Sequence, residues 1–181
     1  MTDSLSTTAH LPAVTEAAFL YPIFENIHAA LKTQPWAVWI AEPRPDRSGK
    51  FNKAPRSPTT GRNIGTTKPH LFGTFDDACK AFETGKYTGV GVLLTGNGII
   101  GVDIDDYIDT FKANEQVKAW VNQACGAGAY CEHSPSGNGL RLFMAGKLPT
   151  TGRKSGPLEI YDDVRFLTVT GHVVDYAKGG A

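Results

Sequence analysis

Hydrophobic residues recur every three or four positions in three parts of the chain, a spacing typical of helices that cover a core. Pro22 lies within the first part, where it fits an early turn or divides the segment. In the second part Thr74 precedes two aspartates, which favours a helix start, and Gly85 ends the apolar pattern. The expected helices span residues 15–32, 74–85 and 108–124.

Shorter runs rich in β-branched and aromatic residues predict strands. The run 36–40 leads into a stretch rich in Pro, Gly and basic residues, which predicts a long ordered loop or an open hairpin through Pro69. The runs 89–95 and 99–105 flank a Gly-Asn-Gly turn that tolerates positive φ, so we expect these two runs to pair as a hairpin. Later strand candidates are 130–133, 140–144, 158–161, 166–170 and 172–175.

This order of elements predicts an α+β fold with a mostly antiparallel sheet flanked by helices. With 181 residues, 41% of them hydrophobic, the chain is long enough to bury one core without disulfides. Residues 1–14 are polar and unpatterned, so we expect a flexible N-terminal arm there. Residues 15–178 form the one expected domain.

Cysteine usage and hydropathy indicate where the protein resides. Cys79, Cys125 and Cys131 are an odd number at spacings that fit no zinc ribbon or CxxC redox pair, which predicts reduced intracellular thiols. No apolar run approaches the roughly 18 residues of a membrane span, and no secretory signal pattern opens the chain. We therefore expect a cytoplasmic protein with no membrane partner.

The formal net charge of zero hides an uneven distribution. Residues 41–70 hold seven basic side chains against two acidic ones, whereas residues 71–134 hold nine acidic against four basic. A basic segment near an acidic one favours binding of a polyanion together with metal ions. Solvated loop charges are the alternative interpretation.

A pair of aspartates ends the apolar run 99–105. Side chains alternate along a strand, so Asp103 and Asp105 face one side while Val102 and Ile104 face the core. Two such carboxylates can hold two hard cations about 3.5–4 Å apart, as in phosphoryl transfer, and Mg²⁺ or Mn²⁺ suits them. The alternative is that Asp105 or Asp106 caps the following helix.

A turn of small polar residues precedes the run 140–144. Its hydroxyl groups and closely approachable backbone N–H groups favour a nest for phosphate oxygens, although a plain turn is the alternative. Arg141 follows on the strand, where its guanidinium can hold a phosphate through two hydrogen bonds. The turn residues are Ser134, Ser136, Gly137, Asn138 and Gly139.

Glu159 lies within an apolar strand, where a carboxylate needs a partner. A third position at the metal site is one interpretation, and an ion pair with Arg165 or Arg153 is the other. Three further polar residues lie close behind and can reach the same cleft: Thr168, Thr170 and His172.

Together these stretches resemble the primase-polymerase domain of the archaeo-eukaryotic primase superfamily, as found in phage, plasmid and mobile-element replication proteins. Asp103 and Asp105 match its acidic pair, the SPSGNG turn its second motif, and Glu159 its later acidic strand residue. Arg141 stands where the family often has a histidine. A guanidinium binds triphosphate but cannot act as an acid or base near neutral pH.

The resemblance implies an archaeo-eukaryotic primase-like (RRM-like) catalytic core and a template-dependent nucleotidyltransferase, a DNA primase or polymerase. It implies two Mg²⁺ or Mn²⁺ ions on Asp103, Asp105 and Glu159, NTP or dNTP as substrate, and a DNA template or primer-template. A fused or separate helicase is an expected partner, with this chain a fragment of a longer protein. Expected nucleotide contacts are Ser134, Ser136, Gly137, Asn138, Gly139, Arg141, Arg165, His172 and Lys53, and expected nucleic-acid contacts are Arg56, Arg62 and Lys68.

Two other functions fit the same residues. One is a non-catalytic replication module that binds nucleotide or nucleic acid through a degenerate site, which the Arg141 departure favours. The other is a metal-dependent nuclease, since carboxylate pairs also cut phosphodiesters. A nuclease has little use for a triphosphate nest, so tight nucleotide binding argues against it.

Overall fold

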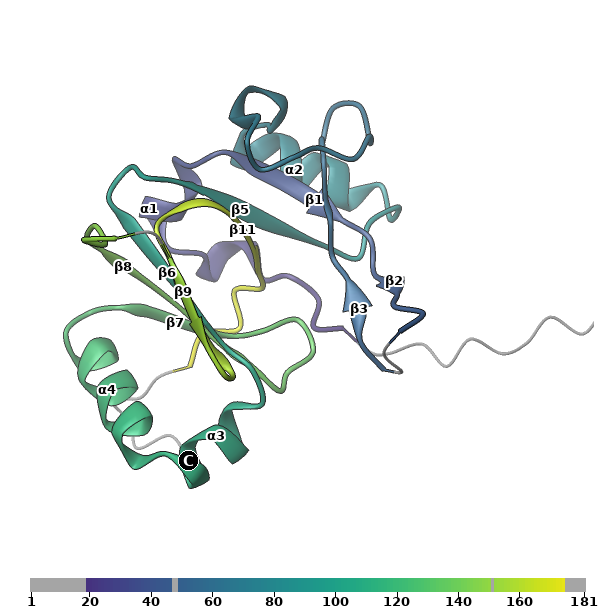
Figure 1. Ribbon diagram of the computed structural model, residues 1–181. Helices are drawn as coiled ribbons and strands as arrows, with labels where there is room; N and C mark the ends of the chain where they lie inside the picture. Colours follow the sequence, from purple (N-terminus) through teal and green to yellow (C-terminus); the bar gives the residue numbers. More distant parts are fainter. Residues whose placement is uncertain (1–18, 47–48, 151, 175–181) are drawn as a thin grey trace, which may run out of the picture.

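The computed structural model describes residues 19–46, 49–150 and 152–174, and it has the α+β architecture that the sequence predicts (Figure 1). The strands are β1 (Trp36–Trp39), β2 (Glu42–Pro43), β3 (Phe51–Asn52), β4 (Pro55–Arg56), β5 (Gly89–Thr95), β6 (Ile99–Ile104), β7 (Tyr130–His133), β8 (Leu140–Ala145), β9 (Arg153–Ser155), β10 (Leu158–Tyr161) and β11 (Asp163–Val169). The helical segments are η1 (Phe24–Asn26), α1 (Ala29–Lys32), η2 (Pro69–Leu71), α2 (Phe75–Glu83), α3 (Tyr107–Ala113) and α4 (Glu115–Gly126).

The described strands form three antiparallel sheets. The first sheet has the order β11-β5-β1-β4, the second has the order β7-β8-β6-β10-β9, and β2 pairs with β3 in a small hairpin. That hairpin lies in the stretch through Pro69, where a loop or open hairpin is expected. Helices α3 and α4 lie at the opposite end of the molecule from α2 (Figure 1).

Two hydrophobic clusters hold the sheets in place. In the first, alternate residues of β1 and β5 pack with Ala78 and Phe82 of α2, and Phe143 of the second sheet joins them. In the second, Val102 and Leu142 pack with residues of α3 and α4. The second sheet therefore has one face that α3 and α4 cover and an opposite face that packs in part against the first sheet, through Phe143 and Gly101.

The predicted hairpin of 89–95 with 99–105 is wrong. β5 pairs with β1 and β11, whereas β6 pairs with β8 and β10, so the turn between them carries the chain from one sheet to the other. Gly96 and Gly98 do have positive φ, but the Gly96 amide donates to the Asp162 carbonyl. A Cβ at Gly101 would lie 2.4 Å from Cδ1 of Leu167, which shows how closely the two sheets pack.

The predicted helix over 15–32 is also wrong over its described part, which contains only η1 and the single turn of α1. Between them Ile27 is extended, with ψ of 127°. The amides of Leu20 and Ile23 donate to the Pro135 and Thr170 carbonyls, so this segment bonds to distant loops rather than to itself. Its apolar spacing serves core packing, since Ile27 and Leu31 are buried.

The remaining predicted elements need smaller corrections. The helix over 108–124 is two helices, because Asn114 is extended and its side chain accepts from the amides of Gln116 and Val117. The helix after Thr74 is confirmed as α2, which begins with a capping box. In the described part of 172–175, Val173 forms only an isolated bridge. The expected N-terminal arm lies outside the described residues.

None of the described helices is both long and apolar enough to cross a membrane. The three cysteines are free thiols.

Candidate active site

A row of charged residues crosses the face of the second sheet that lies away from α3 and α4. The strand register places Glu132 opposite Arg141, Arg141 opposite Asp103, Asp103 opposite Glu159, and Glu159 opposite Lys154. Opposed residues in antiparallel strands lie on the same face, so all five share the face away from α3 and α4. This face therefore presents charged side chains on five strands, with the carboxylates of Asp103 and Glu159 side by side at its centre.

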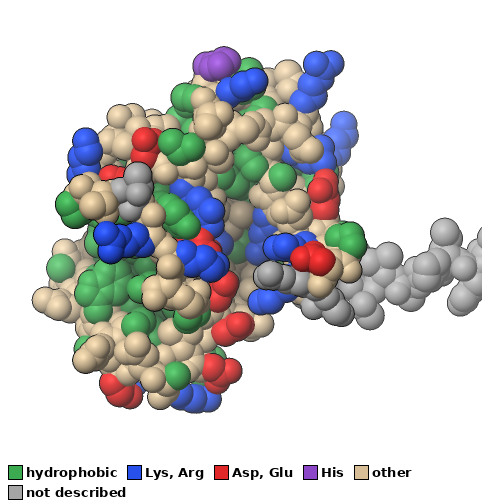
Figure 2. Space-filling view, viewed as in Figure 1, with side chains coloured by type: hydrophobic (Ala, Val, Ile, Leu, Met, Phe, Trp, Pro, Cys, Tyr) green, Lys and Arg blue, Asp and Glu red, His purple; other side chains and the backbone are tan. Residues whose placement is uncertain are grey.

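The row opens into a cavity of about 400 Å³. Acidic and basic side chains adjoin one another near the centre of this side of the molecule (Figure 2). The lining residues are Arg44, Gly49, Lys50, Phe51, Lys53, Asp103, Asp105, Asp106, Ser134, Ser136, Asn138, Gly139, Arg141, Lys154, Glu159 and Arg165.

The cavity thus brings together most of the residues singled out in the sequence. The three carboxylates of the expected metal site line it, as do seven of the expected nucleotide contacts: Lys53, Ser134, Ser136, Asn138, Gly139, Arg141 and Arg165. Five predicted contacts are not among its lining residues: Gly137, His172, Arg56, Arg62 and Lys68.

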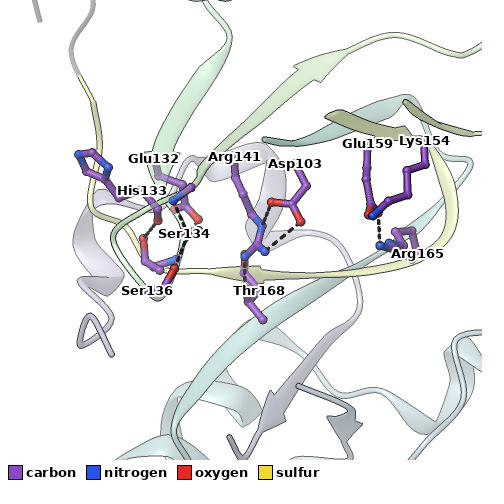
Figure 3. Close-up of polar contacts among 12 residues, drawn as sticks. Asp103, Glu132, His133, Ser134, Ser136, Arg141, Lys154, Glu159, Arg165 and Thr168 are labelled. Carbon is purple, nitrogen blue, oxygen red and sulfur yellow. Dashed lines mark hydrogen bonds and ion pairs between the residues drawn. The ribbon is translucent and has the colours of Figure 1, made fainter. Parts of the chain in front are cut away.

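Arg141 is held in a fixed position at the centre of the row (Figure 3). Its Nε lies 3.3 Å from Oδ1 of Asp103, and Nη2 donates to Oδ2 of the same carboxylate at 3.3 Å. Its Nη1 donates to the Thr168 carbonyl at 2.7 Å and to the Thr168 hydroxyl. With only 8% of its side chain exposed, Arg141 presents a localised positive charge beside Asp103.

Glu159 is bound by two basic side chains. Oε1 pairs with the Lys154 ammonium, and Oε2 pairs with the Arg165 guanidinium, which also lies 4.4 Å from the ring centroid of Tyr161 (Figure 3). The predicted ion pair of Glu159 with Arg165 is confirmed, and the second partner is Lys154 instead of Arg153. Both oxygens of this carboxylate are therefore engaged by cations.

Asp105 and Asp106 lie at the end of β6 on the cavity wall. Burial raises the pKa of Asp105, and the negative charges of Asp103 and Asp106 add to this effect, while Lys50 and Lys154 oppose it. Asp106 occupies the N-cap position of α3 in the left-handed region, with φ of 44°, but its side chain makes no capping hydrogen bond. The predicted capping role is therefore wrong for Asp106.

The SPSGNG turn is closed by its own hydrogen bonds. The Gly137 amide donates to the Ser134 carbonyl at 2.8 Å, and the Gly139 amide donates to the Ser134 hydroxyl at 3.0 Å. These two N–H groups are thus engaged within the turn. The residues that this turn brings to the cavity wall include Ser136 and Asn138.

Comparison with known proteins identifies the family of this site. A DNA primase-polymerase from Nitratiruptor phage NrS-1 is 30% identical over 158 residues, and the match covers 82% of this chain. This chain carries a primase-polymerase domain. It spans only 21% of the phage protein's length. No family model matches the chain.

The primase-polymerase domain has carboxylates that can bind hard cations, but their oxygens are not grouped as a metal site requires. Oxygen donors suit Mg²⁺ and Mn²⁺, and Asp103, Asp105 and Glu159 share one cavity. Yet no three His, Cys, Asp or Glu side chains of the described residues are grouped closely enough to hold a metal ion. Ion pairs already engage Asp103 and Glu159, so metal binding requires these pairs to rearrange.

The glutamate at the buried end of the row lies beside Arg141. Glu132 is fully buried and accepts hydrogen bonds from the Tyr130 hydroxyl and from the amides of Thr170 and Gly171. Burial raises its pKa, which these bonds and the charge of Arg141 lower in part. Glu132 thereby fastens the end of β11 to the second sheet, next to the Thr168–Arg141 contact.

Lys53 has an unusual environment in the primase-polymerase domain. Its ammonium lies 5.6 Å from the ring centroid of Phe19 and 5.7 Å from that of Trp39. Burial is the main reason that its pKa is lowered to about 8; the charge of Arg141 adds to this effect, while that of Asp103 opposes it. Lys53 is thus a cation that burial makes easier to deprotonate than an exposed lysine.

Two predicted contacts are occupied elsewhere in the fold. Nε2 of His172 lies 2.8 Å from the Tyr21 carbonyl oxygen. Arg56 pairs with Glu42 at 2.7 Å and donates to the Gly61 carbonyl, so it stabilises its own loop. Sequence alone does not show which basic residues of 41–70 face the site and which support the segment.

Sequence reasoning missed Gly49 of the cavity wall and four side chains that line it: Arg44, Lys50, Phe51 and Lys154. The basic composition of 41–70 pointed to the right segment, but the β2–β3 hairpin that positions three of these residues has strands of two residues each. Such short strands leave no periodic pattern. Lys154 lies on β9, an exposed three-residue strand with the same lack of pattern.

Proposed function

We propose that this domain is a template-dependent nucleotidyltransferase that primes or extends DNA with two divalent cations. The observation that carries the proposal is the register of β6 with β10, which sets Asp103 opposite Glu159 on a cavity wall that Asp105 also lines. The name of the phage relative agrees with a primase or polymerase role. DNA template and NTP or dNTP are the proposed partners.

The carboxylates Asp103, Asp105 and Glu159 would hold the metal ions. Bound ions would lower the pKa of an attacking 3′-hydroxyl and neutralise the triphosphate. The chain's own cations do the positioning, because the Arg141 guanidinium is already fixed by its hydrogen bond to the Thr168 carbonyl. Ser136 and Asn138 add a hydroxyl and an amide to the same wall.

Primer extension with carboxylate variants tests this proposal. We expect the wild type to extend a primed template with dNTPs and Mn²⁺ or Mg²⁺, and Asp103→Asn or Asp105→Asn to reduce the rate by at least about 100-fold. Asparagine keeps the shape of the side chain and removes the charge. Products are resolved on a denaturing gel.

Asp109→Asn is the matched control, because Asp109 is an exposed aspartate of α3 that pairs with Lys112. Its rate should equal that of the wild type. Absence of extension by the wild type on primed and unprimed templates, with correct folding shown by circular dichroism, would contradict the proposal.

A non-catalytic binding module is the second candidate function. The ion pairs on Asp103 and Glu159 favour it, since they neutralise two of the three carboxylates. Nucleotide binding without extension identifies this function. Shortened strands on the same gel identify a nuclease.

A further inference from the structure

We propose that Lys154 and Arg165 form a releasable clamp on Glu159 that makes metal binding and triphosphate binding depend on each other. This inference rests on the proposed function and adds Lys154 to the residues that bind phosphate. In the clamp, each basic side chain exchanges the Glu159 carboxylate for a phosphate oxygen when nucleotide enters. Glu159 then becomes available to a cation.

The exposure of the three side chains supports a clamp that opens. The Glu159 side chain is only 10% exposed, whereas the Lys154 and Arg165 side chains are 57% and 39% exposed. The carboxylate therefore has little freedom to turn away from its partners. The two cations have solvent beside them and flexible stems, so they are the groups that can move.

The neighbouring ion pair, between Arg141 and Asp103, is not able to open in the same way. The Arg141 side chain is 8% exposed and also donates to the Thr168 carbonyl. If the contact with Asp103 were broken, this hydrogen bond would still hold Arg141 on the cavity wall. Its contacts with Asp103, at 3.3 Å, already leave the carboxylate 18% exposed. The releasable part of the site is therefore at Glu159, on the β9–β10 side of the cavity.

The coupling follows from the competition for one carboxylate. A divalent cation that arrives alone must displace Lys154 and Arg165 from Glu159 or bind beside their positive charge. A triphosphate that arrives alone finds the same two cations already engaged. When both arrive, phosphate oxygens take up the released cations, so each ligand favours the other by the same factor.

Removing the Lys154 charge should therefore change the two affinities in opposite directions. Lys154→Met keeps the aliphatic stem and frees one oxygen of Glu159, so Mn²⁺ alone should bind about two- to fivefold more tightly, the range for one partly exposed ion pair. In saturating Mn²⁺, dATP should bind more weakly, because a phosphate partner is lost. A purely structural role for Lys154 would not give opposite signs.

Lys50→Met is the matched control. Lys50 lines the same cavity and its charge acts on Asp105, but the cations bound to Glu159 in the described part of the chain are Lys154 and Arg165. This variant removes one positive charge without opening the clamp. It should raise the Mn²⁺ affinity by a smaller factor than Lys154→Met does.

Isothermal titration calorimetry measures these affinities for wild type, Lys154→Met, Lys154→Arg and Lys50→Met, with Mn²⁺ alone and with dATP in saturating Mn²⁺. The clamp predicts the opposite shifts for Lys154→Met and near wild-type values for Lys154→Arg, which retains the charge. Equal Mn²⁺ gains for Lys154→Met and Lys50→Met, or no gain for Lys154→Met, would overturn it.

The titrations contain no template, so they are separate from the test of function. Primer extension by the wild type with no Mn²⁺ gain in Lys154→Met rejects the clamp and leaves the proposed function intact. The opposite shifts without extension under any template condition establish the clamp in a binding module and reject the polymerase.

Discussion

At the scale of single residues, the folded state buries the Lys53 ammonium in surroundings that disfavour its positive charge. Burial lowers its pKa from 10.5 to about 8, so the native state binds this proton less tightly than the unfolded chain does. Well below pH 8 both states hold the proton. Between about pH 8 and 10.5 the unfolded chain holds more of it, so the contribution of this group to stability rises with pH.

Lys53→Met tests this linkage. Methionine retains an apolar chain beside Phe19 and Trp39 and removes the desolvated charge. We expect the variant's free energy of unfolding, relative to wild type, to decline as pH rises from 8 to 10 and to be constant between pH 6 and 7. Urea denaturation at these pH values measures the difference, and a difference independent of pH would contradict the shifted pKa.

At the scale of elements, the close approach of β6 to β11 depends on Gly101. A Cβ there would lie 2.4 Å from Cδ1 of Leu167 and 2.9 Å from Cδ1 of Leu94, both of which are buried. Overpacking of this kind costs about 1–3 kcal/mol, so Gly101→Ala should lower the free energy of unfolding by that amount. Chemical denaturation provides the measurement.

Gly126→Ala is the control for this substitution. Gly126 ends α4, and a Cβ at this position meets no atom within 4 Å among the described residues, its chain neighbours and the nearby backbone of α4 left aside. Its stability should stay within about 1 kcal/mol of wild type, with a small gain the expected direction. Equal stability of Gly101→Ala and wild type would show that Leu167 and Leu94 move aside without loss.

These elements also show what sequence pattern can and cannot predict. The strand runs and the Thr74 helix start were predictable because they depend on local spacing and capping. The sheet to which β6 belongs was not predictable, because the Gly96–Gly98 turn suits a hairpin as well as a crossover between sheets.

For the site, strand alternation placed Asp103 correctly on the face of the second sheet opposite the cluster that contains Val102. The Lys154 contact was not predictable, since it depends on a short strand without a pattern.

At the scale of the whole molecule, a chain with zero formal net charge can attract nucleic acid, as the proposed function requires, only through the local distribution of its charges. The cavity has acidic residues on the second sheet, while Arg44 and Lys50 enter from the β2–β3 hairpin. Arg62 and Lys68 belong to the same basic segment but do not line the cavity. A strand that passes through the site would therefore contact the hairpin and leave the other two residues in solvent.

The salt dependence of single-stranded DNA binding distinguishes these positions. Each phosphate contact that is lost should reduce the slope of log affinity against log salt by about 0.7, because fewer counterions are released. We expect Lys50→Met to weaken binding and to reduce the slope by about this amount, whereas Lys68→Met, which removes the same charge outside the cavity, should change neither. Fluorescence anisotropy across a salt series measures both quantities. An equal loss of DNA affinity in the two variants would mean that the whole basic segment 41–70, rather than the β2–β3 hairpin alone, binds the DNA strand, as the sequence alone suggests.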